Sequence, residues 1–188
     1  MVASVNHDLV IEPRPCDHWD QRPADTDISL LVIHNISLPP GQYRTPYIDD
    51  FFGGRLDCTA HPYFAQLKDV RVSAHCVIFR DGRICQYVPF TARAWHAGLS
   101  LWRGREKCND FSIGIELEGC DDEAYTEAQY QSLLSLCQYL YQQFPTLAAG
   151  DITGHSDIAP GRKTDPGPAF DWPAFRSALA QRLTTAQT

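Results

Sequence analysis

Short apolar runs separated by turn-forming residues dominate the first two thirds of the chain. Residues 29–34 form a β-rich apolar run, which is typical of a buried central strand. Two more runs, at 75–79 and 84–88, flank an Asp-Gly pair at 81–82, a strong hairpin signal. From 111 to 118 apolar and polar residues alternate, which predicts a half-buried strand with one polar face.

Helical signals follow in the last third of the chain. Thr126 and Gln129 form a capping-box pattern that opens a helix, and Pro145 ends it. Asp171 is the expected N-cap of a last helix. Two shorter amphipathic pieces are expected within residues 42–70, and a short strand is expected to end at His155.

Strands and helices are therefore interleaved along the chain. This order predicts a single α/β (α+β) domain with a central mixed β-sheet flanked by helices. Residues 1–27 are polar and contain prolines, so we expect an N-terminal arm packed on the domain. The domain itself is expected over residues 28–184.

Composition narrows the class of protein. A chain of 188 residues with 44% hydrophobic and 21% charged residues is an ordinary single globular domain. A net charge of −7 without any Lys/Arg run argues against nucleic acid as a partner. No apolar run could span a bilayer and no signal peptide is visible, so we expect no membrane partner and a cytoplasmic location. The seven cysteines include no Cys-x-x-Cys pair and are expected to be reduced thiols.

Two histidines and one aspartate form a candidate metal site. His34 and His155 each end a predicted strand, and Asp165 follows in a loop rich in Pro and Gly. Two imidazoles and a carboxylate with an open fourth position are a catalytic zinc set. The spacing is weak evidence by itself, because most single histidines are structural. An iron site using His155 and Asp157 is a lesser alternative.

Glu116 is a candidate general base. It lies on the polar face of its predicted strand, beside Gly114, which should leave room for a ligand. The simpler interpretation is a solvated carboxylate on an open sheet face. Glu118 shares that face, so the two carboxylates could instead be a glycosidase pair. Lys163 could stabilise an oxyanion or be a surface lysine.

Four basic residues lie in the segments of sequence on either side of a tryptophan. Arg71, Arg93, Arg105 and Lys107 lie near Trp95 in sequence. Such cations could bind a carboxylate-rich ligand, and the alternative is scattered surface charge. The indole could stack on a sugar or pack in the core.

Five segments, taken together and in order, resemble one enzyme family. The segments are LLVIHNISLPPG at 30–41, HPYF at 61–64, RAWHAG at 93–98, CNDFSIGIELEG at 108–119 and GHSDIAPGRKTDPG at 154–167. They are similar to zinc-dependent N-acetylmuramoyl-L-alanine amidases with the peptidoglycan-recognition-protein fold. The likeness runs from about residue 16 to about residue 176.

The resemblance implies a role for each candidate residue. It places Zn²⁺ on His34, His155 and Asp165. It makes Glu116 the general base and Lys163 the oxyanion-stabilising lysine. The implied substrate-binding residues are Asn35, Arg71, Trp95 and Lys107. The family pattern has arginine at position 107, and lysine lacks the bidentate fork that grips a carboxylate.

The implied reaction is hydrolysis of the lactyl amide between 1,6-anhydro-N-acetylmuramic acid and L-Ala of the stem peptide. The partner is then an anhydromuropeptide, the setting is cytoplasmic peptidoglycan recycling, and a link to β-lactamase control follows from the resemblance alone. We expect a monomer, with residues 38–70 as a mobile flap over the groove. Three alternatives stay open: a non-catalytic muropeptide binder of the same fold, a carboxylate-pair glycosidase, and an exported amidase acting on intact wall.

Overall fold

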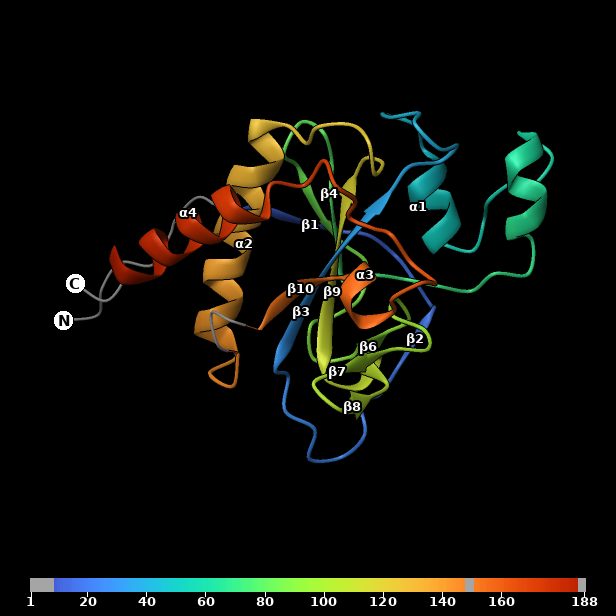
Figure 1. Cartoon of the computed structure of the whole chain (residues 1–188). Helices are drawn as coiled ribbons and strands as arrows, with labels where there is room; N and C mark the ends of the chain where they lie inside the picture. The colour runs from blue at the N-terminus through green and yellow to red at the C-terminus, as the bar shows by residue number, and fades with distance from the viewer. Residues whose placement is uncertain (1–8, 148–150, 186–188) are drawn as a thin grey trace.

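A six-stranded sheet forms the centre of the computed structural model, which describes residues 9–147 and 151–185 (Figure 1). The strand order is β1-β5-β4-β9-β3-β10. β3 is parallel to β9 and β10, β9 is parallel to β4, and β5 is antiparallel to β4. The predicted mixed sheet is confirmed. The strands are β1 (Ile11–Pro13), β3 (Leu30–Ile36), β4 (Cys76–Ile78), β5 (Ile84–Gln86), β9 (Ser112–Glu118) and β10 (Ile152–Gly154).

Helices and two small ribbons surround this sheet. The ribbons pair β2 (Trp19–Asp20) with β6 (Arg93–Ala94) and β7 (Leu101–Trp102) with β8 (Arg105–Glu106). The helices are α1 (Tyr47–Phe52), α2 (Glu127–Gln143), α3 (His155–Ile158) and α4 (Trp172–Thr185), with 3-10 turns η1 (Pro62–Leu67) and η2 (Cys108–Asp110). No helix within the described residues is both long and apolar enough to cross a bilayer.

Local sequence signals account for several element boundaries. The hairpin at 81–82 joins β4 to β5 as predicted. The capping box is present at the start of α2, where Thr126 accepts from the Gln129 N–H and Gln129 reaches back to the Thr126 N–H. Asp171 Oδ1 accepts from the Ala174 N–H at 3.0 Å, which confirms the predicted cap of α4.

Different segments of the chain pack on the two faces of the sheet. Leu31 and Ile33 of β3 belong to the same apolar cluster as residues of α2 and α4, which lie together on one side of the sheet (Figure 1). Leu30 and Val32 point the other way, into a cluster that includes Ala97 between β6 and β7. The sheet is thus the middle layer, with α2 and α4 on one face and mostly irregular chain, together with the short helices α1 and α3, on the other.

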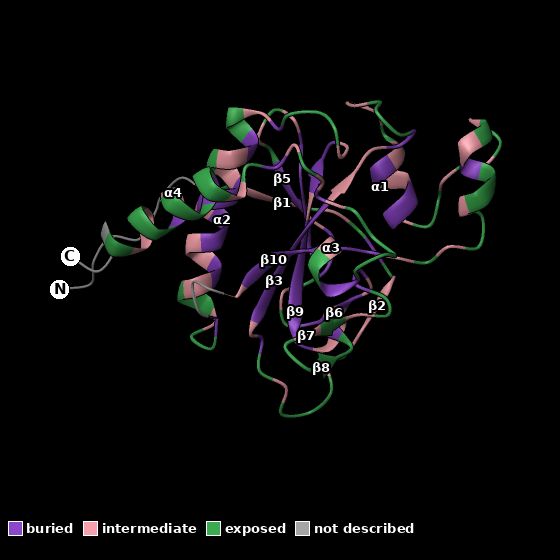
Figure 2. Cartoon of the chain, in the orientation of Figure 1, coloured by how far each residue is buried: buried purple, intermediate pink, exposed green. Residues whose placement is uncertain are grey.

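The prediction of a half-buried strand at 111–118 is wrong. Six of the seven residues of β9 are buried, and Figure 2 shows this strand in purple along most of its length. The alternating polar residues face chain rather than water, because the irregular layer covers that side. Buried polar residues need hydrogen-bond partners, and the surroundings of those in β9 are described below.

The structure also confirms some of the predictions for the segments before and between the central strands. Ile11–Pro13 adds an edge strand beside β5, and the boundary between residues 27 and 28 stays a prediction. α1 and η1 correspond to the two predicted amphipathic pieces, and each buries a phenylalanine, Phe52 and Phe64. The mobility of residues 38–70 stays a prediction. All seven cysteines are free thiols, as expected.

Candidate metal centre

Three neighbouring parallel strands bring the candidate residues together. His34 of β3 is the register partner of Glu116 of β9, so both side chains leave the sheet on the same face. On the other side of β3, Gly154 pairs with Ile33, and His155 follows at once as the first residue of α3. The carboxyl ends of adjacent parallel strands meet at one edge, which is where sites gather in such sheets.

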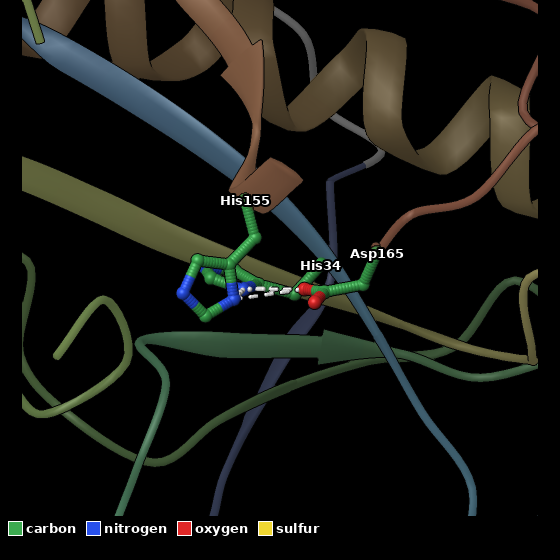
Figure 3. A group of neighbouring side chains, drawn as sticks. All are labelled: His34, His155 and Asp165. Carbon is green, nitrogen blue, oxygen red and sulfur yellow. Dashed lines mark hydrogen bonds and ion pairs between the residues drawn. The ribbon is translucent and has the colours of Figure 1, made fainter. Parts of the chain in front are cut away.

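His34, His155 and Asp165 converge on one point (Figure 3). Asp165 Oδ2 lies 2.9 Å from His34 Nδ1 and 3.0 Å from His155 Nδ1, and the two Nδ1 atoms are 2.9 Å apart. The imidazoles are 1% and 3% exposed, so the group lies below the surface. The structure therefore brings together the three residues that the sequence predicted as metal ligands.

The chemistry of these three atoms fits a cation. His155 Nε2 donates to the Ala97 carbonyl at 3.1 Å, so in a neutral ring the facing Nδ1 carries a lone pair. Asp165 Oδ2 is also an acceptor, yet it lies 3.0 Å from that atom. Two acceptors this close need a positive centre or a proton between them. Two histidines and one carboxylate are ligands that suit zinc.

The ionisation of Asp165 and His34 agrees with this role. Burial opposes charge on Asp165, but the two neighbouring imidazoles, His155 and His34, outweigh it and hold the pKa of this carboxyl below its usual range. Burial lowers the pKa of His34 to about 4 despite the neighbouring Asp165 carboxylate. An ionised carboxylate and a neutral imidazole are the forms that bind a metal.

Glu116 lies beside this group with an unused oxygen. Its Oε2 is buried and has no hydrogen-bond partner within the described protein. Burial, reinforced by the charge of Asp165, raises the pKa of Glu116 well above its ordinary value, and Lys163 acts in the opposite direction. The interpretation of Glu116 as a solvated carboxylate on an open face is wrong. A buried carboxyl with a raised pKa is suited to proton transfer.

A cavity of about 690 Å³ opens onto these residues. Four predicted site residues line it: Asn35, Glu116, Lys163 and Asp165. The rest of its wall comes from residues 36–40, α1, η1 and the chain up to Val72, together with residues 119–122 and 162–164. Asn35 donates to Asp121 Oδ1 at 2.8 Å and to the Pro166 carbonyl at 3.2 Å, so it also ties β3 to the loop that carries Asp165.

The other three predicted substrate-binding residues do not line this cavity. Arg71 is exposed and donates to the carbonyls of Lys68 and Val70. Trp95 is half-buried, and its ring stacks on His18 with centroids 6.2 Å apart. Lys107 lines a separate hollow of about 470 Å³ beside Leu99 and Ile158. Their contact with substrate stays a prediction.

Two sequence-based alternatives are wrong in this structure. Glu118 is 1% exposed, and its carboxylate accepts from the backbone N–H groups of Arg44 at 2.7 Å and Arg80 at 3.0 Å, so it is a structural clamp and not half of a glycosidase pair. Asp157 accepts from Thr153 and from the Gly154 N–H at the start of α3, so it is not an iron ligand.

Space at Gly114 does not admit a ligand, contrary to expectation. A Cβ there would overlap the imidazole of His96, which fills that space. His96 in turn contacts His34, with His96 Nδ1 2.9 Å from His34 Nε2. The sequence analysis did not identify His96 as part of the site. The signal that could have pointed to it is Gly114, because a glycine next to a candidate base can make room for a side chain as well as for a ligand.

Known proteins similar to this chain are amidases. The family model of N-acetylmuramoyl-L-alanine amidases matches residues 24–168. A 1,6-anhydro-N-acetylmuramyl-L-alanine amidase, AmpD, from Salmonella typhimurium is 60% identical over 166 residues, covering 88% of each chain. The crystal structure of a selenomethionine AmpD derivative superposes with a TM-score of 0.87 at 58% identity, covering 89% of this chain and 93% of that one.

A substrate complex is also among the similar structures. The amidase AmiD from Escherichia coli, solved with anhydro-N-acetylmuramic acid-L-Ala-D-γ-Glu-L-Lys, is 33% identical with a TM-score of 0.60, covering 84% of this chain and 60% of that one. The chain belongs to the N-acetylmuramoyl-L-alanine amidase family. The family and the fold predicted from the sequence are confirmed.

Proposed function

We propose that this chain is a zinc-dependent amidase that hydrolyses the lactyl amide bond between 1,6-anhydro-N-acetylmuramic acid and L-Ala of a stem peptide. The observation that carries the proposal is the convergence of His34 Nδ1, His155 Nδ1 and Asp165 Oδ2 within about 3 Å at one side of a cavity. Family membership supports the type of reaction.

Zinc is the metal that this ligand set favours. His34, His155 and Asp165 would hold it and leave one position open, as in catalytic zinc sites. When bound, zinc supplies an activated water and a Lewis acid for the amide carbonyl. The sheet fixes His34, and the Ala97 carbonyl orients His155, so the ligands are set before substrate arrives.

Glu116 is the proton carrier in this mechanism. Its free Oε2 accepts a proton from the attacking water and returns it to the departing L-Ala amine. Burial raises the pKa of this carboxyl, which favours holding the proton between its two transfers. Its fixed place in β9, opposite His34, keeps that proton transfer close to the metal ligands.

Lys163 supplies positive charge to the same cavity. It lies two residues before Asp165 on the loop after α3, and both line the wall. An ammonium group there stabilises the negative charge that develops on the amide oxygen. This charge also opposes the effect of Asp165 on the Glu116 pKa.

The substrate class comes from the relatives. The Salmonella protein is named for a 1,6-anhydro-N-acetylmuramyl-L-alanine substrate, and the AmiD complex holds an anhydromuropeptide. A cavity of about 690 Å³ has the size of a small-ligand site. Asn35 lines it, while Arg71, Trp95 and Lys107 would contact the more distant parts of a long sugar–peptide ligand.

The setting of the reaction is part of the same proposal. We place the enzyme in cytoplasmic peptidoglycan recycling, as a monomer, with an effect on β-lactamase control through removal of anhydromuropeptides. Cell fractionation and light scattering test the location and the oligomeric state directly.

The test of the function uses purified protein and anhydromuropeptide. Chelation should abolish release of the L-Ala-headed peptide, and added zinc should restore it. Mass spectrometry of the products separates the alternatives, since a glycosidase would release sugars and a binding module would release nothing. A chelated, metal-free sample with full activity would contradict the mechanism.

A further inference from the structure

A line of buried polar groups runs from the metal centre into the core. His96 Nδ1 lies 2.9 Å from His34 Nε2, on the side of the His34 ring opposite Asp165. His96 Nε2 lies 3.1 Å from Ser112 Oγ, and Ser112 Oγ lies 2.5 Å from the Cys108 carbonyl oxygen. All three side chains in this line are buried, and none of them is used in the mechanism above except His34.

The direction of each hydrogen bond follows from the last acceptor. A carbonyl oxygen can only accept, so the Ser112 hydroxyl donates to Cys108. Its oxygen then accepts from His96 Nε2–H. His96 is buried and neither group bonded to its ring is an anion, and a buried imidazolium without an anionic partner is costly, so the ring is a neutral imidazole with a single N–H. The remaining His96 Nδ1 is an acceptor.

The same reasoning fixes the form of His34. Because His96 Nδ1 accepts, the proton of that bond belongs to His34 Nε2. A neutral His34 then has a bare Nδ1, and this is the atom that faces His155 and Asp165. All three converging atoms are therefore lone-pair donors, as a metal requires.

We propose that His96 is a positioning residue that accepts the Nε2 proton of His34 and so holds His34 with its Nδ1 turned to the metal. The proposal rests on the zinc site proposed above and concerns a residue that touches neither metal nor substrate. Outer partners of this kind commonly contribute roughly 10- to 100-fold to metal affinity.

The surrounding chain is shaped to place His96. Gly114 on β9 lacks the Cβ that would overlap the His96 imidazole, so the ring lies directly against the strand. Asn109 Oδ1 accepts from the N–H groups of His96 at 3.1 Å and Ala97 at 2.7 Å. Since the Ala97 carbonyl orients His155, one short segment positions both metal-binding histidines.

The experiment compares two buried histidines that lie next to each other. His96→Leu removes the acceptor and keeps a similar volume, and zinc affinity, measured by competition with a chelating dye, should fall roughly 10- to 100-fold. His75→Leu is the matched control, because His75 is 0% exposed, lies 5.8 Å from His96 between ring centroids, and bonds to Gly114 N–H and the Ala92 carbonyl. Its zinc affinity should stay close to the wild-type value.

A conservative variant and a spectroscopic measurement complete the test. His96→Asn offers a carbonyl oxygen near the position of Nδ1 and should recover most of the lost zinc affinity. In the zinc-loaded wild-type protein, ¹⁵N-histidine NMR should find the proton on Nε2 in both His34 and His96. This measurement needs no variant and remains decisive if His96→Leu fails to fold.

The outcomes separate this proposal from the proposed function. Equal losses of zinc affinity in His96→Leu and His75→Leu, or a proton on His96 Nδ1, would overturn the positioning role and leave the amidase untouched. Wild-type protein that binds no zinc would overturn both.

Discussion

His34 and Glu116 are register partners across the β3–β9 ladder, and their side chains share one face of the sheet. Neighbouring strands lie about 4.8 Å apart, so the ladder itself sets the spacing between the proposed metal ligand and the proposed proton carrier. Neither residue depends on a loop for its place. A proton transfer that tolerates little misplacement gains from such a rigid frame.

Replacing Glu116 should separate proton transfer from metal binding. Glu116→Gln keeps the shape of the side chain but cannot take a proton, so kcat should fall roughly 10²- to 10⁴-fold. Zinc content should not change, because Glu116 is outside the group of converging ligands. Steady-state kinetics and metal analysis of the same sample check both points. A variant that loses its zinc would instead make Glu116 a support for the metal ligands.

Glu118 should prove structural. Glu118→Ala leaves the backbone N–H groups of Arg44 and Arg80 without their acceptor and should destabilise the fold by roughly 1–3 kcal/mol. The amidase rate of the folded fraction should stay near that of the wild type. Urea unfolding and amidase assays on the same protein test this. Loss of turnover at unchanged stability would revive a direct role for the second carboxylate.

Buried His75 predicts a loss of stability in mild acid. Burial, followed by the positive charge of Arg22, lowers the pKa of His75 from 6.5 to about 3 in the folded protein. The unfolded chain therefore binds the proton first, so stability is complete above pH 6.5 and falls as the pH drops toward 3.

The expected size follows from linkage. Between pH 7 and pH 5 this one histidine should cost about 2 kcal/mol of unfolding free energy. Urea unfolding of the wild type and of His75→Leu at both pH values measures the difference, and the variant should lose about that much less. Equal losses in the two proteins would show that His75 does not titrate between the folded and unfolded states as expected.

Position 107 offers a test of peptide recognition. Lys107→Arg restores the guanidinium of the family pattern, whose bidentate geometry suits a carboxylate. KM for an anhydromuropeptide with a free peptide carboxylate should fall while kcat stays unchanged, because the residue is remote from the reacting bond. Lys107→Ala removes the positive charge at this position and should raise KM. If neither variant alters KM, the hollow beside Leu99 is not part of the binding site.

Local rules predicted what is local in this fold. β3, the β4–β5 hairpin and the start of α2 follow from apolar runs, an Asp-Gly turn and a capping box, each read within a few residues. The metal ligands emerged as strand-end residues and were selected by the family resemblance. Convergence of His34 and His155, 121 residues apart, is a property of strand order that spacing alone does not contain.

Errors arose wherever a second layer covers the sheet. The alternation in β9 resembles that of an open-faced strand, because a polar residue buried against partners and one exposed to water look alike in sequence. Glu118 and Gly114 were both misinterpreted for this reason. Two of their partners, Arg44 and His96, come from segments outside the sheet, and the third, Arg80, lies in the turn between β4 and β5.

The division between sheet and wall has a consequence for engineering. The proposed metal ligands His34 and His155 and the proposed proton carrier Glu116 lie on or directly beside strands, whereas much of the cavity wall is chain between 36 and 72 that contributes none of them. Transplanting that wall from a relative with another muropeptide preference would exchange the part that selects the substrate and retain the part that cuts the bond. The sheet and the cavity wall can therefore be varied separately.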